Sequence, residues 1–194
     1  MYLVIAEKPS VSRAIARVIG AENREEGFLS GKDCIVSWCL GHLAEYLQPA
    51  GYAKRYESWK YEDLPIISDE WKLAVSQEKK EQFYTLKRLV NSPDVEYVVN
   101  ACDAGREGEL IFRRVYQLSG SRKPVKRLWI SSMEDSAIRA GMEQLKDAEE
   151  YRNLAEAAVC RAKADWLVGM NATRAFTTKY YKKLTVGRVQ TPTL

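Results

Sequence analysis

The sequence predicts an α/β fold in which a mostly parallel, doubly wound sheet is flanked by helices and followed by the helical start of a second, truncated domain. Three observations lead to this prediction. Short apolar runs rich in β-branched residues alternate with segments of helical spacing. Glycine, proline and serine residues, which favour turns, stand between them. From about residue 147 to residue 178 the helical pattern continues with few breaks. Strands that alternate with helices in this way are typical of a parallel sheet with helices on its faces.

The first expected element is a strand at residues 2–6, and the second is a helix at 11–19. Ser10 is the expected N-cap of that helix and Gly20 its expected stop. Residues 49–71 combine prolines with several aromatic side chains and are expected to form a long irregular excursion. Further strands are expected at 34–38, 95–101 and 125–130, and further helices at 76–90, 107–118 and 132–145, the last opening on a capping-box-like Ser132-Met-Glu-Asp135.

The composition is that of a globular protein with enough apolar material for a core. The chain has 194 residues, of which 46% are hydrophobic and 29% charged. These values exclude disordered, collagenous and disulfide-stapled proteins. No run of about 18 apolar residues could span a membrane, and the first residues, MYLVIAEKPS, lack the features of a signal peptide. We therefore expect a cytoplasmic protein with no membrane partner.

The net charge of +4 is unevenly distributed along the chain. Residues 1–150 carry 22 Lys and Arg against 24 Asp and Glu, whereas residues 151–194 carry 8 against 2. The whole basic surplus therefore lies in the last part of the sequence. Such an asymmetry indicates a polyanion contact confined to one region, although a solvated, lysine-rich helix face would have the same composition.

The cysteine and histidine content argues against two classes of site. Cys34, Cys39, Cys102 and Cys160 have no C-x-x-C spacing, and a single histidine, His42, cannot complete a Cys/His zinc set. The thiols are expected to pack as small apolar residues in a reducing compartment. Because no nucleophile-elbow pattern accompanies His42, we assign it no chemistry and expect a structural histidine.

Acidic side chains follow two of the expected strands. Asp103 lies on the turn after the third strand, and Glu107 lies four residues later in the first turn of a helix, so that both can face one point. Glu109 would point elsewhere. Glu7, beside Lys8, ends the first strand. If the two strands are neighbours, three carboxylates converge at the carboxyl edge of the sheet, where ligand sites of open α/β sheets collect. Such a cluster needs a cation, and Mg²⁺ is the one that carboxylate oxygens suit.

A purely structural interpretation exists for these acids. Acidic residues in a first helical turn complement the helix dipole, and Asp103 alone could be an N-cap. The combination of Asp103 and Glu107, with Arg106 between them and the Glu7-Lys8 pair at the other strand end, favours a site instead. The dinucleotide-binding and P-loop fingerprints do not occur in the sequence.

Six motifs occur in an order that resembles one family. They are Glu7-Lys8-Pro9-Ser10, Gly41-His42-Leu43, Asp103-Ala-Gly-Arg-Glu-Gly-Glu109, Arg161-Ala-Lys-Ala-Asp165-Trp166, Asn171-Ala-Thr-Arg174 and Gly187-Arg-Val-Gln-Thr-Pro192. Together they resemble the N-terminal part of bacterial type IA DNA topoisomerases, specifically the topoisomerase III group. The resemblance implies a Toprim domain over residues 1–148, which is a Rossmann-like parallel sheet with an acidic Mg²⁺ site. For residues 149–194 it implies the beginning of a domain that grips single-stranded DNA.

The resemblance also implies a reaction, reversible transesterification. In this family a tyrosine attacks a phosphodiester and forms a 5′-phosphotyrosyl bond, and another strand passes before the break is resealed. Glu7 would handle the proton at the 3′-oxygen, Lys8 would stabilise charge on the scissile phosphate, and Asp103 and Glu107 would hold Mg²⁺, with Glu7 as a further metal ligand. Phosphoryl transfer in general needs positioning, charge neutralisation and a placed acid or base.

Two features depart from the family pattern. The common form has a second aspartate two residues after the first, where this chain has Gly105. Either Glu7 and Glu107 supply the missing ligand, or Mg²⁺ binds more weakly. The catalytic tyrosine of the family lies well downstream of the GRVQ motif, and Tyr180 and Tyr181 do not lie in its sequence context. We therefore expect no nucleophilic tyrosine in this chain and no DNA cleavage by it.

The resemblance assigns a partner, single-stranded DNA, to the basic end of the chain. Its arginines and lysines can neutralise phosphates, and Trp166 can stack on a base. Arg161 and Asp165 also have the spacing of an ordinary helical ion pair, and Trp166 could equally be a core residue. The expected DNA-binding residues are Trp59, Arg161, Asp165, Trp166, Arg174, Thr185, Val186, Gly187, Arg188, Val189 and Gln190.

Two other functions stay open on the sequence. The chain could be a non-catalytic single-stranded DNA-binding module, or part of another Toprim enzyme such as a primase or a nuclease. The GRVQTP motif and the lack of a zinc-binding pattern argue against a primase or nuclease. We expect a monomer in the bacterial cytoplasm, associated with the nucleoid, with Mg²⁺ as its cofactor.

Overall fold

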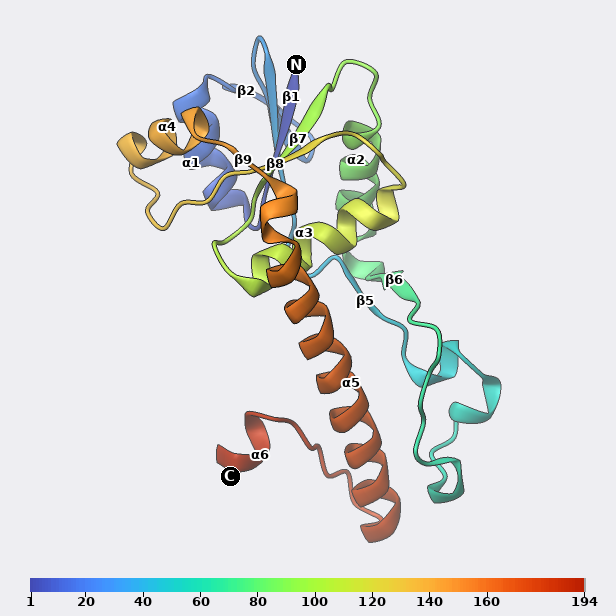
Figure 1. Ribbon diagram of the computed structural model, residues 1–194. Helices are drawn as coiled ribbons and strands as arrows, with labels where there is room; N and C mark the ends of the chain where they lie inside the picture. The colour runs from blue at the N-terminus through green and yellow to red at the C-terminus, as the bar shows by residue number, and fades with distance from the viewer. Residues whose placement is uncertain (194) are drawn as a thin grey trace. The chain divides into compact units, whose positions relative to one another are not determined.

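Figure 1 shows the computed structural model of the chain, which describes residues 1–193. Leu194, the last residue of the expected second domain, lies outside the described residues. The strands are β1 (Tyr2–Ala6), β2 (Asn23–Glu25), β3 (Phe28–Ser30), β4 (Cys34–Trp38), β5 (Ala44–Tyr46), β6 (Leu73–Val75), β7 (Tyr97–Ala101), β8 (Val125–Arg127) and β9 (Lys146–Asp147). The helices are α1 (Pro9–Ile19), α2 (Lys80–Val90), α3 (Arg106–Ser119), α4 (Asp135–Glu143), α5 (Arg152–Tyr180) and α6 (Gln190–Thr193).

The chain divides into two compact units that are interleaved along the sequence. Unit 1 comprises Met1–Glu45 and Val75–Ala158, and unit 2 comprises Tyr46–Ala74 and Val159–Leu194. The expected excursion at 49–71 therefore belongs to the same unit as most of α5. It consists of short 3₁₀ turns at Pro49–Gly51, Lys54–Tyr56 and Tyr61–Asp63, joined by irregular backbone.

Unit 1 is built on a mixed sheet whose central strands are parallel. The strand order is β2-β3-β4-β1-β7-β8-β9, with parallel pairing between β4, β1, β7 and β8 and antiparallel pairing at both edges. This confirms the predicted mostly parallel α/β fold. The hairpin of β2 and β3 and the short strand β9 were not predicted. Because β2 and β9 are exposed throughout, they have no apolar alternation by which a strand is recognised.

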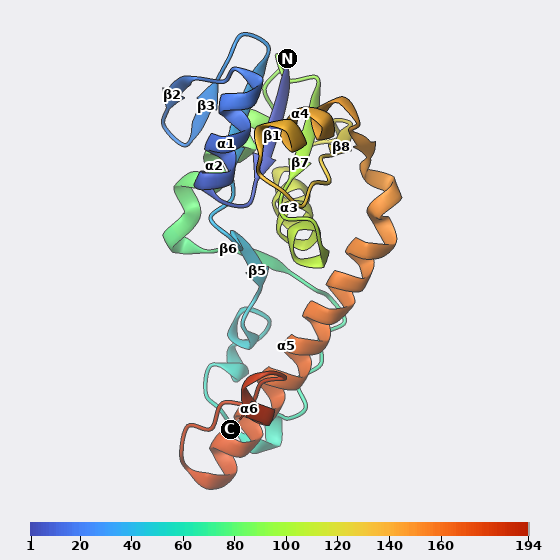
Figure 2. The same ribbon diagram turned by 90° about the vertical axis from the view of Figure 1, so that its left-hand side faces the viewer.

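Helices cover both faces of this sheet, so unit 1 has three layers (Figures 1 and 2). Successive side chains of β1 point to opposite faces. Leu3 and Ile5 pack with Phe83 and Leu86 of α2 and with Phe112 of α3 in one core cluster. On the other face, the alternate β1 residues Val4 and Ala6 belong to a second core cluster. The helices contribute Ile15 and Ala16 from α1 and Ile138 from α4 to this cluster. The sheet is thus doubly wound, as predicted.

The helix ends differ in part from the expectation. Gly20 stops α1 as predicted, with a left-handed φ of 79° and its N–H bonded to the Ala16 carbonyl. Ser10 is not the N-cap, because Pro9 already occupies the first helical turn. The expected capping box at Ser132 is also wrong. Ser132 Oγ accepts from Glu134 N at 3.2 Å, and α4 begins one residue later.

Unit 2 is organised by polar side chains of α5 that bind the backbone of the excursion. Asn171 donates from Nδ2 to the Ile66 carbonyl at 2.9 Å and accepts from Ile66 N at 2.6 Å. Ile66 is 2% exposed, so this two-way contact fixes a buried residue of an otherwise irregular segment. No helix in residues 1–193 combines the length and apolar character needed to cross a bilayer.

Three of the four cysteines pack as the sequence predicts. Cys34, Cys39 and Cys102 are buried, whereas Cys160 is exposed. The hydrogen bond with Cys39 and burial together raise the pKa of the Cys102 thiol well above its ordinary value. Cys102 therefore stays a neutral thiol packed in the core.

Candidate functional site

The loops that follow three neighbouring parallel strands meet at one edge of the sheet in unit 1. β1 lies between β4 and β7, with Ala6 in register with Trp38 on one side and with Ala101 on the other. The loops that come next therefore leave the sheet side by side. Glu7 and Asp103 lie on two adjoining loops, which meets the condition that the sequence set for a shared acidic site.

Lys8 lies between two of the predicted carboxylates. Its Nζ is 3.3 Å from Glu7 Oε1 and 3.8 Å from Asp103 Oδ2. Glu7 is buried, whereas the side chains of Lys8 and Asp103 are about half exposed. The hydrogen bond and charge of Glu7, and then the charge of Asp103, raise the pKa of the Lys8 ammonium above its ordinary value. Lys8 therefore stays protonated at neutral pH and offsets the charge of the two carboxylates.

Glu107, the third predicted carboxylate, has a different partner. It stands in the first turn of α3, and its Oε1 lies 2.5 Å from His42 Nε2. His42 comes from the loop after β4, the third loop at this edge. The sequence alone gives no chemical role to His42. The Gly41-His42-Leu43 motif marked the position, but its partner is 65 residues away along the chain.

The first turn of α3 packs tightly onto the Asp103 loop. A Cβ on Gly108 would lie 2.1 Å from the Asp103 carbonyl oxygen, so the close approach requires glycine. Gly105 is different, because a Cβ there would meet no atom within 4 Å. Its φ of 168° is extended backbone that any residue adopts. The position at which the common family form has an aspartate therefore has room for a side chain.

The donor groups at this edge suit Mg²⁺, although they are paired with protein side chains. Within residues 1–193, no three Asp, Glu, His or Cys side chains gather closely enough to hold a metal ion. The expected convergence of Glu7, Asp103 and Glu107 into one group is therefore not found: Lys8 pairs with Glu7 and Asp103, and His42 contacts Glu107. Asp103 and Glu107 are 51% and 56% exposed, and Mg²⁺ is usually held by one or two carboxylates together with water. The chemistry of these two side chains therefore fits the ion.

Glu109 points away from the other acids, as its spacing predicts, and is 1% exposed. Its Oε1 lies 2.7 Å from Arg127 Nε and accepts from Asn100 Nδ2 at 3.0 Å, and its Oε2 accepts from Arg113 Nε at 3.0 Å. A buried carboxylate is tolerated when it is paired and hydrogen-bonded in this way. Glu109 is therefore a structural anchor beneath the site.

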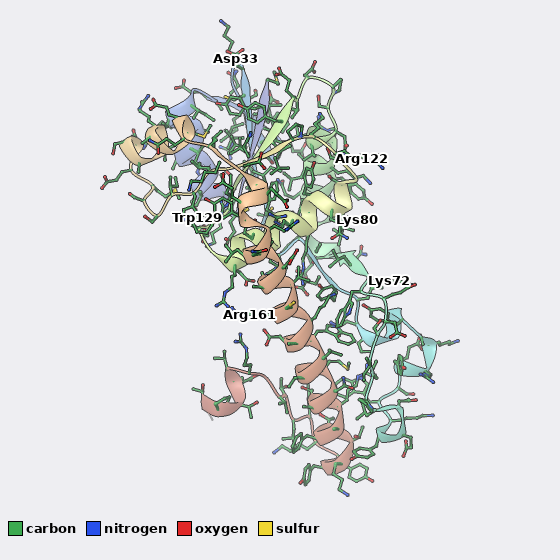
Figure 3. The ribbon with its side chains drawn as sticks, in the orientation of Figure 1. Asp33, Lys72, Lys80, Arg122, Trp129 and Arg161 are labelled. Atoms are coloured by element: carbon green, nitrogen blue, oxygen red, sulfur yellow. The ribbon has the colours of Figure 1, made fainter. Side chains whose placement is uncertain are left out.

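Arg127 connects Glu109 to the loop that carries Asp103, and the sequence alone does not predict this role. Its Nη1 donates to the carbonyls of Asn100, Cys102 and Leu128, and its Nη2 donates to the Asp103 carbonyl at 2.8 Å. The guanidinium also lies 4.9 Å from the ring centroid of Trp129, which is labelled in Figure 3. An arginine within the apolar run VKRLWI was the available signal, because a charge in a buried strand needs a partner.

Unit 2 holds the residues predicted to bind DNA, and several of them bind one another. Trp166 lies in an aromatic cluster with Tyr52 and Trp71, at centroid distances of 5.9 and 5.4 Å, and its Nε1 donates to the Leu47 carbonyl at 3.1 Å. Its side chain is partly buried. Of the two interpretations that the sequence left open, this geometry agrees with a packing role for Trp166.

Arg174 and Trp59 are in contact with each other. The Arg174 guanidinium lies 5.0 Å from the Trp59 ring centroid, and its Nη1 donates to the Tyr56 carbonyl at 3.0 Å. Arg174 is 5% exposed, whereas Trp59 is 42% exposed. Burial lowers the pKa of the Arg174 guanidinium. The exposed member of this pair is therefore the tryptophan.

Asp165 joins two of the predicted DNA-binding arginines. Its carboxylate oxygens lie 3.7 Å from Arg161 Nε on the same helix and 3.0 Å from Arg188 Nε of the GRVQ motif. Arg161, labelled in Figure 3, is therefore part of a three-residue ion cluster. The ordinary helical ion pair that the sequence left open is present, and Arg188 shares it.

The segment of residues 185–190 is held against α5. Thr173 Oγ1 of α5 accepts from Val186 N at 2.9 Å. The Gly187 N–H donates to Thr191 Oγ1 of α6 at 2.9 Å, which is a local contact of the segment. Val186 and Gly187 are partly buried. The exposed members of the predicted set in this segment are Thr185, Arg188, Val189 and Gln190.

Two family models match the chain. A Toprim domain model matches residues 2–133, and a DNA topoisomerase model matches residues 149–194. The Toprim match covers most of unit 1 and includes the loops that carry Glu7, His42, Asp103 and Glu107.

Curated relatives match nearly the whole chain. DNA topoisomerase 3 of Bacillus subtilis is 50% identical over 192 residues, which is 99% of this chain and 26% of that protein. DNA topoisomerase 3 of Shouchella clausii is 50% identical over 191 residues, and that of Staphylococcus epidermidis is 48% identical over 192 residues. The matches to the Shouchella and Staphylococcus proteins cover 98% and 99% of this chain, respectively. The chain thus spans about a quarter of the length of these relatives.

A solved structure has the same fold. Full-length topoisomerase I from Thermotoga maritima superimposes with a TM-score of 0.65 at 19% identity, over 97% of this chain and 28% of that one. The motif resemblance seen in the sequence is confirmed by these matches. The chain belongs to the Toprim domain family, as a homologue of the N-terminal region of the type IA enzyme DNA topoisomerase 3.

Proposed function

We propose that this chain is the N-terminal part of a type IA topoisomerase that breaks and rejoins single DNA strands through a 5′-phosphotyrosine. Residues 1–148 would be the Toprim domain, and residues 149–194 would be the start of the DNA-gripping domain. The observation that supports the proposal is the placement of Glu7, Lys8, Asp103 and Glu107 on loops at a single edge of the sheet. The nucleophilic tyrosine would lie outside these 194 residues, so the chain alone is expected not to cleave DNA.

Each of these side chains has a role that its surroundings support. Glu7 is buried beside a protonated amine, which suits a carboxylate that handles the proton of the 3′-oxygen. Lys8 carries a positive charge with partial exposure and would neutralise the scissile phosphate. Asp103 and Glu107 would hold Mg²⁺. When bound, the ion would neutralise negative charge on the phosphate oxygens.

We expect the Asp103→Asn variant to bind Mg²⁺ at least about tenfold more weakly than the wild-type chain, a loss of about 1.4 kcal/mol. The amide keeps the shape of the side chain but removes a ligand charge. Isothermal titration of Mg²⁺ into the 194-residue chain measures the effect. The matched control is Glu22→Gln, an exposed acid between α1 and β2, which should leave the affinity unchanged.

Equal responses from Asp103→Asn and the wild type would contradict the assigned metal site. Equal losses from Asp103→Asn and Glu22→Gln would show that Mg²⁺ responds only to net charge. Either result would remove the metal-site part of the proposal.

Gly105→Asp is expected to strengthen Mg²⁺ binding several-fold without lowering the unfolding temperature. The new Cβ meets no atom within 4 Å, and the backbone is extended, so the substitution causes no clash. A third exposed carboxylate beside Asp103 adds charge and a possible ligand. Gly105→Asn is the matched control, because it adds the same volume without the charge. If the two variants bind Mg²⁺ equally, the gain from the carboxylate is disproved.

We propose single-stranded DNA as the partner of unit 2. Residues 151–194 carry 8 Lys and Arg against 2 Asp and Glu. Trp59 exposes an aromatic ring that Arg174 holds in place, and Arg188 is half exposed next to Asp165. A base can stack on such a ring, and phosphates bind the cations. The predicted residues that are themselves buried, above all Arg174, would act by positioning their neighbours.

A non-catalytic DNA-binding module is the second candidate, favoured by the concentration of exposed cations in unit 2. For this chain by itself the two functions predict the same DNA binding, and Mg²⁺ binding at Asp103 distinguishes them. The match of residues 149–194 to a DNA topoisomerase model favours the topoisomerase over a Toprim primase or nuclease. A monomer in the bacterial cytoplasm, located with nucleoid DNA, belongs to the same proposal.

A further inference from the structure

His42 lies at the acidic edge because its loop continues the pairing of β4 with β1. Cys39 N donates to the Ala6 carbonyl at 2.8 Å, and Gly41 N donates to the Glu7 carbonyl at 3.3 Å. Gly41 has a left-handed φ of 67°, a conformation that favours glycine. His42 is therefore held one residue beyond a direct backbone contact with Glu7.

The backbone around His42 is anchored by its neighbours. Lys79 Nζ donates to the His42 carbonyl at 3.0 Å, and the carbonyl of the fully buried Leu43 accepts from Ser76 N at 2.9 Å. A ring on backbone fixed in this way has little freedom to move. Glu107, by contrast, is 56% exposed on its side chain. In the His42–Glu107 contact, the histidine is the less exposed member, at 30% against 56%.

Only one nitrogen of the His42 ring makes a hydrogen bond to the described residues. An ionised carboxylate only accepts hydrogen bonds, so His42 Nε2 donates to Glu107 Oε1 across 2.5 Å. His42 Nδ1 is buried and has no hydrogen-bond partner within residues 1–193. The single hydrogen bond that the ring makes is therefore directed at Glu107, which is not the pattern of a histidine satisfied within the core.

We propose that His42 is a positioning residue for the cation site, and that it orients the Glu107 carboxylate by binding Oε1 and leaving Oε2 for Mg²⁺. This inference rests on the proposed function of Glu107 as a metal ligand. A carboxylate that is already oriented loses less freedom when it binds a cation. Hydrogen-bond partners of metal ligands commonly contribute about 10–100-fold to metal affinity. His42 itself touches neither the ion nor the reacting atoms in this role.

The test measures Mg²⁺ affinity by isothermal titration, and Mn²⁺ affinity by electron paramagnetic resonance, on the 194-residue chain. His42→Ala is expected to weaken both affinities about tenfold or more. His42→Gln places an amide N–H near the position of Nε2 and should restore most of the loss. In a Glu107→Gln background, His42→Ala should cause no additional loss, because the side chain that it orients no longer ligates.

A merely structural histidine would give a different pattern. His42→Ala would then lower the unfolding temperature while leaving the affinity of the folded protein unchanged, or it would weaken binding equally with and without Glu107. Either result overturns the proposal. Failure of His42→Gln to recover affinity, when the variant unfolds at the wild-type temperature, would also overturn it.

Asp103→Asn separates this inference from the proposed function. If Asp103→Asn weakens Mg²⁺ binding and His42→Ala does not, the metal site stands and the role of His42 is wrong. If neither substitution changes the affinity, the metal site is itself wrong and the positioning role fails with it.

Discussion

The Glu109→Gln variant is expected to lose about 3–5 kcal/mol of unfolding free energy, because breaking a buried ion pair from one side leaves the other charge uncompensated. Arg127 has a fully buried side chain, and Glu109 Oε1 lies 2.7 Å from its Nε. Arg113 loses its carboxylate partner as well. Urea unfolding followed by tryptophan fluorescence measures the change as a lower midpoint.

The matched control for this prediction is Glu107→Gln, two residues earlier on the same helix. Its hydrogen bond with His42 is exposed, so the substitution should cost about 1 kcal/mol or less. The two variants make the same chemical change at sites that differ in burial. If they unfold at the same urea concentration, the Glu109–Arg127 pair is not what stabilises the sheet edge.

Single-stranded DNA binding by the chain is expected to weaken about 50-fold between about 50 and 200 mM salt, which is the result for roughly four neutralised phosphates. The four cations that we expect to make these contacts are exposed in unit 2, and they are Lys179, Lys182, Lys183 and Arg188. Fluorescence anisotropy with a labelled oligothymidine, repeated across the salt series, measures the slope.

Replacing Lys182 and Lys183 by glutamine should lower that slope by about 1.4, because each single-strand phosphate contact contributes about 0.7. Arg122→Gln is the control, since Arg122 is an exposed arginine of unit 1 (labelled in Figure 3). Binding that does not respond to salt would contradict the assignment. Equal losses from the control and the double variant would place the DNA contact outside unit 2.

Sequence patterns were sufficient where a local signal existed. The strands β1, β4 and β7 are recognisable from apolar runs, and Gly20 from its place after a helical pattern. Where segments are short and exposed, as in β2 and β9, no pattern distinguishes a strand from a loop. The two N-cap predictions are wrong for another reason. Ser10 and Ser132 each have the right side chain, but the backbone enters the helix at a different residue.

The candidate site divides in the same way. Its acids were predictable because they follow strand ends, and parallel strands bring their carboxyl ends to one edge. Their partners were not predictable. The pairing of His42 with Glu107 and that of Arg127 with Glu109 join segments far apart in the chain, and only the order of the strands brings them together.

By itself the sequence determined the α/β class, the edge of the sheet whose loops carry the acids, and the basic region of residues 151–194. The tertiary structure decided which partner each acid meets: Lys8 for Glu7 and Asp103, His42 for Glu107, and Arg127 for Glu109. The physical reason is the range of each signal. Periodicity and charge spacing act over a few residues, whereas burial and ion pairing depend on which distant segments the folded sheet places side by side.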